Sequence, residues 1–137
     1  MKKALFTVPI LICCTFAKDF NPQMQEYINS LKAEAKKIDS SFKDFDAKRG
    51  EKVFLLERVG KKGQNISCSS CHTFDLNKNG KNIFTNKTIK PLSPKQEASR
   101  LTNVKDVKKW LRRNFQDVYV REGTALEKGD VLYFINQ

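Results

Sequence analysis

The stretch NISCSSCHTF, residues 65–74, decides how this chain is interpreted. It places two cysteines three residues apart, and the next residue, His72, is the only histidine in the 137 residues. Two thiols and one imidazole at this spacing fit three kinds of site: zinc, a redox-active disulfide, or a covalently attached haem. The remaining sequence has to distinguish between them.

The first residues have the pattern of an export signal. Two lysines at positions 2 and 3 precede a mostly apolar run that ends at Phe16, and a small residue, Ala17, follows. This pattern predicts a signal peptide over residues 1–17 and a mature chain of 18–137, exported to the periplasm. The apolar run is too short to span a bilayer, so we expect no stable membrane insertion.

Removal of the signal leaves Cys68 and Cys71 as the cysteines of the mature chain. A lipoprotein signal that uses Cys13 or Cys14 is the alternative, but Ile12 stands where a small residue is expected. The compartment outside the cytoplasm is oxidising, so two thiols should not remain unused there. A structural disulfide between residues three apart would constrain the unfolded chain very little.

The charge of the chain points to a protein partner. The formal net charge is +11, and loss of two lysines with the signal leaves 11 − 2 = +9. A basic exported protein attracts acidic proteins or anionic lipid, whereas nucleic acid is not expected outside the cell. We expect an acidic partner protein, with a merely solvated basic surface as the alternative.

The length suits one domain, and its pattern is helical. Apolar residues recur with helical spacing in four segments: 21–38, 44–58, 104–118 and from Thr124 to the C-terminus. Thr124 and Glu127 form a capping-box pattern at the start of the last segment. Residues 74–94 lack any period and predict a loop, and no stretch alternates as a strand. The sequence therefore predicts an all-α fold.

Covalent haem accounts for each residue of the motif. Zinc needs about four ligands in a structural site, and the chain has no further histidine or mature cysteine to complete one. A redox Cys-x-x-Cys follows a strand in a βαβ setting, and no strand is predicted here. In contrast, Cys68 and Cys71 can add to the two vinyl groups of a porphyrin, while His72 ligates the iron. We predict one haem c.

The sixth ligand of the iron is not the usual one. Electron-transfer cytochromes close this position with Met or a second His, and the only mature methionine is Met24, far upstream of the motif. Asn114 lies on the apolar face of the segment 104–118, where a polar side chain needs a partner. It is either a buried amide bonded to backbone or a ligand on or near the iron, and a lysine is the lesser alternative for that ligand.

These features resemble the class I c-type cytochromes. The resemblance rests on Gly50 and Phe54 before the motif, on Cys-x-x-Cys-His, and on a C-terminal helix in which Gly129 would permit a close crossing and Tyr133 or Phe134 would pack. It implies a class I cytochrome c fold around one covalent haem over residues 44–137. The helical segment within residues 18–43 is then an N-terminal extension.

Within that class, the chain resembles the SHP (sphaeroides haem protein) family over residues 46–137. The matching segments are IKPLSP (89–94), KKWLRRN (108–114), DVYVREGT (117–124) and EKGDVL (127–132). The resemblance implies His72 and Asn114 as the two axial ligands, with the Asn leaving on reduction so that oxygen or another small ligand can bind. It also implies export and a dihaem cytochrome c as redox partner.

The chain departs from the family pattern at one pair of positions. The resemblance implies a cysteine after the Asn and another before the Thr of the last helix, joined as a disulfide near the iron. Here these positions hold Phe115 and Gly123. We expect Phe115 to fill the space with apolar surface instead.

The expected function is single-electron transfer by a haem iron that binds a diatomic gas (O2, NO or CO) when Asn114 moves away. A plain electron shuttle, or a gas sensor or carrier without a redox partner, is the alternative, and a turnover enzyme is less expected. Supporting roles are assigned to four residues. Pro91 offers its carbonyl to the proton of the haem-ligating histidine, Trp110 packs on the ring, and Arg112 or Arg113 pairs with a propionate.

Overall fold

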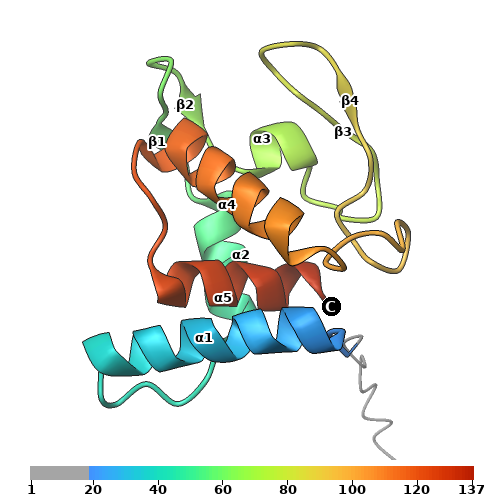
Figure 1. Ribbon diagram of the computed structural model, residues 1–137. Coiled ribbons are helices and arrows are strands. Elements are labelled where there is room, and N and C mark those ends of the chain that lie inside the picture. Colours follow the sequence, from blue (N-terminus) through green and yellow to red (C-terminus); the bar gives the residue numbers. More distant parts are fainter. Residues whose placement is uncertain (1–18) are drawn as a thin grey trace, which may run out of the picture.

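The computed structural model describes residues 19–137 (Figure 1). The expected signal peptide, including Cys13 and Cys14, lies outside the described residues. The described chain is mostly helical, which confirms the all-α class. Its helices are α1 (Pro22–Ile38), α2 (Ala47–Leu55), α3 (Ser69–His72), α4 (Val104–Tyr119) and α5 (Ala125–Ile135). The capping box is present at the start of α5, where Thr124 and Glu127 bond each other's backbone.

The prediction that the chain lacks strands was wrong. Two antiparallel hairpins form, β1 (Arg58–Val59) with β2 (Asn65–Ile66) and β3 (Gly80–Lys81) with β4 (Thr88–Ile89). Strands of two residues are too short to show alternation in a sequence. The helix expected over 44–58 is also shorter, because the chain leaves the helix after Leu55 to enter the first hairpin.

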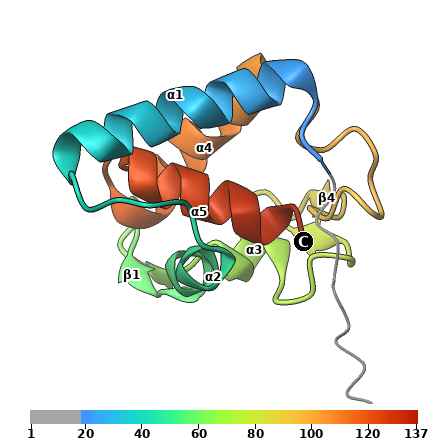
Figure 2. The ribbon, with the colours of Figure 1, turned by 90° about the horizontal axis from the view of Figure 1, so that it is seen from below.

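Helix α2 crosses α5 closely, and Gly50 allows it. A Cβ on Gly50 would lie 2.0 Å from the carbonyl oxygen of Asp130 on α5. Gly129, expected to permit this crossing, instead makes room for the ring of Phe45, which a Cβ there would approach to 2.3 Å. Phe134 does pack near the crossing, with its ring centroid 5.4 Å from that of Phe54. Figure 2 shows α2 end-on, beside α3 and on the side of α5 opposite α1.

A buried ion pair fixes the same crossing. The Asp130 side chain, 2% exposed, accepts hydrogen bonds from Nε and Nη2 of Arg49 at 2.8 and 2.9 Å. It also accepts one from the backbone N–H of Asp46, the N-cap of α2, at 2.7 Å. One carboxylate on α5 therefore holds the start of α2.

The N-terminal helix α1 packs on the domain rather than away from it. Figures 1 and 2 both show it lying along α5. It buries Met24 and Ile28 completely, together with Leu31 and Ala35, in one core with residues of α4 and α5. Burial of a side chain of this size is worth about 1.5–3 kcal/mol. The extension is thus part of the core, and Met24 is a core residue.

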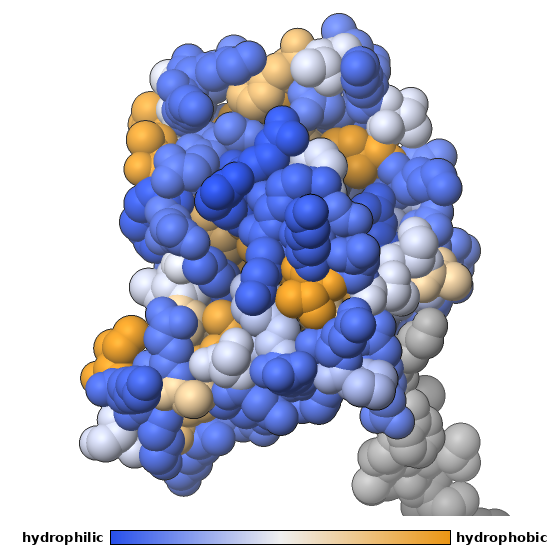
Figure 3. All heavy atoms as spheres, in the orientation of Figure 1, coloured by the Kyte–Doolittle hydropathy of each residue, from blue (hydrophilic) through white to orange (hydrophobic). Residues whose placement is uncertain are grey.

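The outer face of α4 is strongly hydrophilic. Figure 3 shows polar and charged side chains over most of this face, with small apolar areas between them. None of the helices described in residues 19–137 has the length and apolar character needed to cross a membrane.

Candidate haem site

The short helix α3 carries the Cys-x-x-Cys-His motif. The carbonyl oxygen of Cys68 accepts hydrogen bonds from the backbone N–H groups of Cys71, at 3.2 Å, and His72, at 3.0 Å. This single turn brings Cys68, Cys71 and His72 to the wall of one cavity. The two cysteines are free thiols and do not form a disulfide.

Strand β3 supports α3 from outside. A Cβ on Gly80 would lie 2.1 Å from the carbonyl oxygen of Cys71 and 3.0 Å from Cα of His72. Only a residue without a side chain lets β3 approach the motif this closely. Thr73 then ends the helix in a positive-φ conformation, with φ of 64°.

The surroundings of Cys68 do not suit thiol redox chemistry or zinc. Burial, followed by the nearby Cys71, raises the pKa of the Cys68 thiol to about 12. Redox-active and metal-binding cysteines instead have a lowered pKa, because the thiolate is the reactive form. In residues 19–137, no three His, Cys, Asp or Glu side chains are placed to hold a metal ion together. Of the three kinds of site that the motif allows, an attached haem therefore fits these cysteines best.

His72 has the environment of an axial ligand. Its Nδ1 atom is buried and, within residues 19–137, has no hydrogen-bond partner. Burial, and secondarily the charge of Arg100, lowers the pKa of His72 to about 4. The imidazole is therefore neutral at physiological pH, which is the form that binds iron. A buried polar atom without a partner at the cavity wall fits a group that the haem would complete.

Two adjoining cavities of about 370 and 540 Å³ lie between α3 and α4. They share the residues Cys68, Leu92, Arg100, Trp110 and Asn114, so they form two parts of one space. The smaller part is lined further by apolar residues of α4 and α5, and the larger part by His72 and the second hairpin. The combination of an apolar lining with a few polar groups is typical of a cofactor site.

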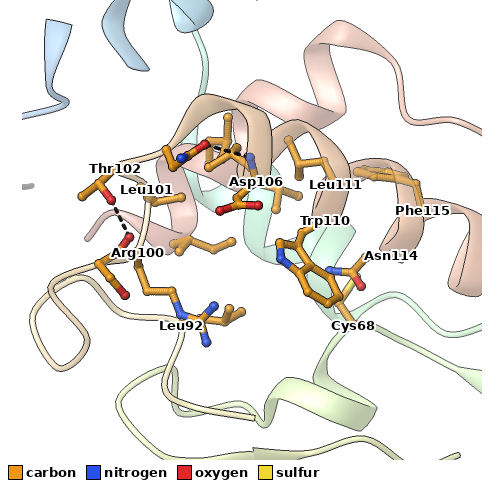
Figure 4. A pocket seen from close by; sticks show the side chains of 16 residues that line it. Cys68, Leu92, Arg100, Leu101, Thr102, Asp106, Trp110, Leu111, Asn114 and Phe115 are labelled. Atoms are coloured by element: carbon orange, nitrogen blue, oxygen red, sulfur yellow. Dashed lines mark hydrogen bonds between the residues drawn. The ribbon is translucent and has the colours of Figure 1, made fainter. Parts of the chain in front are cut away.

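Helix α4 divides its side chains between the core and this cavity. Leu111, Phe115 and Val118 are buried and each borders one part of the cavity, whereas Trp110 and Asn114 are less buried and line both parts. Figure 4 shows Trp110 and Asn114 side by side, pointing into the space that Cys68 borders. The side-chain amide of Asn114 has no hydrogen bond to any residue of 19–137. The interpretation of Asn114 as an amide bonded to backbone therefore does not hold.

Phe115 fills the space that its neighbour Gly123 leaves. The Phe115 side chain is 3% exposed, and a Cβ on Gly123 would lie 2.8 Å from three atoms of its ring. A large and a small residue thus pack together at this position. The expectation that Phe115 supplies apolar packing is confirmed.

Of the other predicted site residues, some line the cavity and others do not. Trp110 is 48% exposed and has the guanidinium of Arg113 over its ring at 5.0 Å. Arg113 lines the larger part of the cavity, whereas Arg112 lines neither part. The carbonyl of Pro91 accepts a hydrogen bond from Arg100 at 2.8 Å. A hydrogen bond from His72 to Pro91 stays a prediction.

Sequence reasoning missed Arg100 and Leu92, which line both parts of the cavity. They lie in a segment without helical or strand period, so their direction has no signature in the sequence. The quoted segment IKPLSP contains Leu92, but it gave no role to that residue.

A mostly helical domain with Cys-x-x-Cys-His on a short helix between α2 and α4 defines a class I c-type cytochrome. Solved structures agree: oxidised SHP, an oxygen-binding cytochrome c, matches with a TM-score of 0.72 and 33% identity over 86% of this chain and 97% of that one. Oxidised cytochrome c'' from Methylophilus methylotrophus matches with a TM-score of 0.73 over 82% of this chain and 91% of that one, at 22% identity.

The chain belongs to the family of the cytochrome c-type protein SHP from Cereibacter sphaeroides, to which it is 39% identical over 90 residues, 66% of this chain and 69% of the relative. Residues 40–135 also match a family described as a domain of unknown function, DUF1924. Since these relatives are c-type cytochromes, the chain carries a covalent haem c, with one attachment motif for one haem.

Proposed function

We propose that this protein is an exported cytochrome that transfers single electrons and, once reduced, binds a diatomic gas when Asn114 moves aside. One observation carries the proposal. Asn114 from α4 and His72 from α3 line the same cavity, and the Asn114 amide is not held by any hydrogen bond within residues 19–137. The relative SHP is an oxygen-binding cytochrome c, which supports the gas-binding part.

The haem iron, when bound, supplies a one-electron change and an axial position for a small ligand. Cys68 and Cys71 fasten the porphyrin, and His72 donates a ring nitrogen from a neutral imidazole. The amide oxygen of Asn114 is a hard, neutral and weak donor, which prefers ferric to ferrous iron. We infer that this side chain ligates only the oxidised state and leaves on reduction.

The surroundings of Asn114 suit a displaceable ligand. Leu111 and Phe115, on either side of it along α4, line the smaller part of the cavity with apolar surface. A diatomic gas is favoured there over bulk water, because burial of water without polar partners is costly. The Asn114 amide can rotate toward the larger part of the cavity without breaking a hydrogen bond.

Absorption spectra of the oxidised, reduced and CO-treated reduced protein test this proposal. The ferrous protein should be high-spin and should bind CO. Asn114→Ala should leave the ferrous spectrum nearly unchanged but alter the ferric one, since water or hydroxide then replaces the amide. Gln116→Ala, on the same helix but lining neither part of the cavity, is the matched control and should change neither spectrum.

A ferrous protein that is low-spin and does not bind CO would refute the displacement of Asn114. The protein would then be a plain electron shuttle. A lysine would be the next candidate for the sixth ligand, since Met24 is fully buried in the core and lines neither part of the cavity.

The location and the partner belong to the same proposal. Attachment of haem c takes place after export, which agrees with the signal pattern at residues 1–17 and predicts Lys18 as the first residue of the purified protein. The net charge without the signal, 11 − 2 = +9, favours an acidic redox partner, such as a dihaem cytochrome c. Electron exchange with that partner should slow as salt rises. A rate that does not change with ionic strength would argue against electrostatic docking.

A further inference from the structure

Arg100, in the segment before α4, is a cation at the wall of the haem cavity. Its side chain is half-buried and lines both parts of the cavity. Two hydrogen bonds of 2.8 Å hold the guanidinium in place, from Nε to the carbonyl of Pro91 and from Nη2 to the carbonyl of Lys90. Figure 4 shows the Arg100 side chain beside that of Leu92, on the opposite side of Trp110 from Asn114.

The charge of Arg100 has no acidic partner in residues 19–137. The nearest acid in sequence, Glu97, forms its ion pair with Lys90 at 2.9 Å and a hydrogen bond with Ser99 at 2.7 Å. Asp106, which also lines the smaller part of the cavity, pairs with Lys109 at 2.7 Å. A half-buried cation at an apolar wall is costly unless an anion compensates it. The cavity therefore lacks an anion at this point.

The free donors of Arg100 match a carboxylate. A guanidinium has five N–H donors, and two are used by carbonyls, which leaves three. Both N–H groups of Nη1 are among those left. The planar fork of arginine binds carboxylates with parallel hydrogen bonds and is always charged.

We propose that Arg100 binds a carboxylate of the haem, one of its two propionates, and so holds the porphyrin against the segment Lys90–Leu92. The inference rests on the presence of haem c in this site, but not on the displacement of Asn114. It assigns the pairing first to Arg100, which sequence reasoning gave to Arg112 or Arg113. Arg113, at the larger part of the cavity, remains available to the second propionate.

The same side chain is a positioning residue for the proximal ligand. Arg100 and His72 line the same part of the cavity, and Arg100 holds the Pro91 carbonyl that is expected to face the imidazole. A positive charge near the iron favours the ferrous state, because ferric iron carries one more charge. Loss of the Arg100 charge should therefore lower the reduction potential.

The test is the midpoint potential of four haem-loaded variants: Arg100→Gln, Arg100→Lys, Arg112→Gln and Arg113→Gln. Arg100→Gln should shift the reduction equilibrium about tenfold toward the ferric state, which is about −59 mV for one electron. Arg100→Lys keeps the charge but loses the fork, so we expect less than half of that shift. Arg112 is exposed on α4 and lines neither part of the cavity. The reduction equilibrium of Arg112→Gln should therefore stay within about twofold of that of the wild type.

Equal shifts for Arg100→Gln and Arg112→Gln would overturn the inference, as would a full shift in Arg113→Gln alone. If Arg100→Gln does not retain haem, Arg100→Lys decides: a shift below about threefold supports the charge role, and loss of haem in that variant as well overturns it. CO binding, recorded on the same samples, tests Asn114 separately. A protein that fails to bind CO but shows the potential shift refutes the gas-binding proposal and leaves this inference standing.

Discussion

Replacement of Asp130 by alanine should destabilise the protein strongly without touching the haem cavity. The carboxylate is 2% exposed and accepts three hydrogen bonds, two from Arg49 and one from the backbone of Asp46. Removal leaves the Asp46 N–H without its acceptor, at a cost of about 1–3 kcal/mol. The contribution of Arg49 is smaller, about 1–2 kcal/mol, because its side chain is 46% exposed and solvent screens the lost charge.

Together these terms give a loss of about 3 kcal/mol in the free energy of unfolding. For a domain of this size, this corresponds to a fall in Tm of about 12 °C. Urea denaturation of the haem-loaded protein, followed by circular dichroism and by the haem absorption band, measures the change. Glu51→Ala is the matched control, since this α2 residue is exposed and forms no ion pair within residues 19–137. Its effect should stay within about 0.5 kcal/mol.

A loss below about 1 kcal/mol in Asp130→Ala would refute the view that this carboxylate fixes the α2–α5 crossing. A double-mutant cycle with Arg49→Met separates the two parts, because the coupling energy reports the ion pair alone. We expect a coupling of about 1–2 kcal/mol, with the remainder assigned to the N-cap N–H.

Three further changes test other features. Gly80→Ala would place a Cβ 2.1 Å from the Cys71 carbonyl, so it should lower the yield of haem-loaded protein severalfold, and a normal yield with an unchanged haem spectrum would contradict this. Val120→Gly should stabilise the protein by about 0.5–1 kcal/mol in thermal unfolding, because an exposed β-branched residue with φ of 54° is strained, and a loss would refute the strain. The Arg121 guanidinium holds the pKa of Glu127 below its usual 4.5, so this pair stabilises the fold above that pH and loses its effect as pH falls through the lowered value. Glu127→Gln should therefore be less stable than wild type by about 1 kcal/mol at pH 7 and equal to it near pH 2, and a difference independent of pH would exclude the ion pair.

The sequence was most informative where a motif or a helical period is formed by residues close together in the chain. Cys68, Cys71 and His72 lie within five residues, so their spacing reduced the site to three kinds, of which the rest of the sequence favoured haem. Helices α1, α4 and α5 lie within a residue or two of the predicted helices. Local signals also gave the capping box at Thr124, since its partner stands three residues away.

The sequence was less informative where a contact joins distant segments. The helical period of α4 placed Trp110 on the apolar face with Leu111 and Val118, but Trp110 is 48% exposed and borders the cavity, because the space beside it is not filled by protein side chains. The use of Gly50 rather than Gly129 at the crossing depends on which backbone lies opposite. Arg100 reaches carbonyls nine and ten residues away across an irregular loop, and such a path has no period to detect.

The pairing of Phe115 with Gly123 has a consequence for how the protein matures. The Phe115 ring packs against Gly123, which has no side chain, and this contact holds α4 next to the start of α5 without a covalent bond. Within residues 19–137, thiols then occur only at the haem motif. Folding of this part of the chain requires no oxidase, and in residues 19–137 the two cysteines have no third thiol with which to form a wrong disulfide before haem arrives. The ligand-bearing helix should accordingly keep its place in reducing and oxidising surroundings alike.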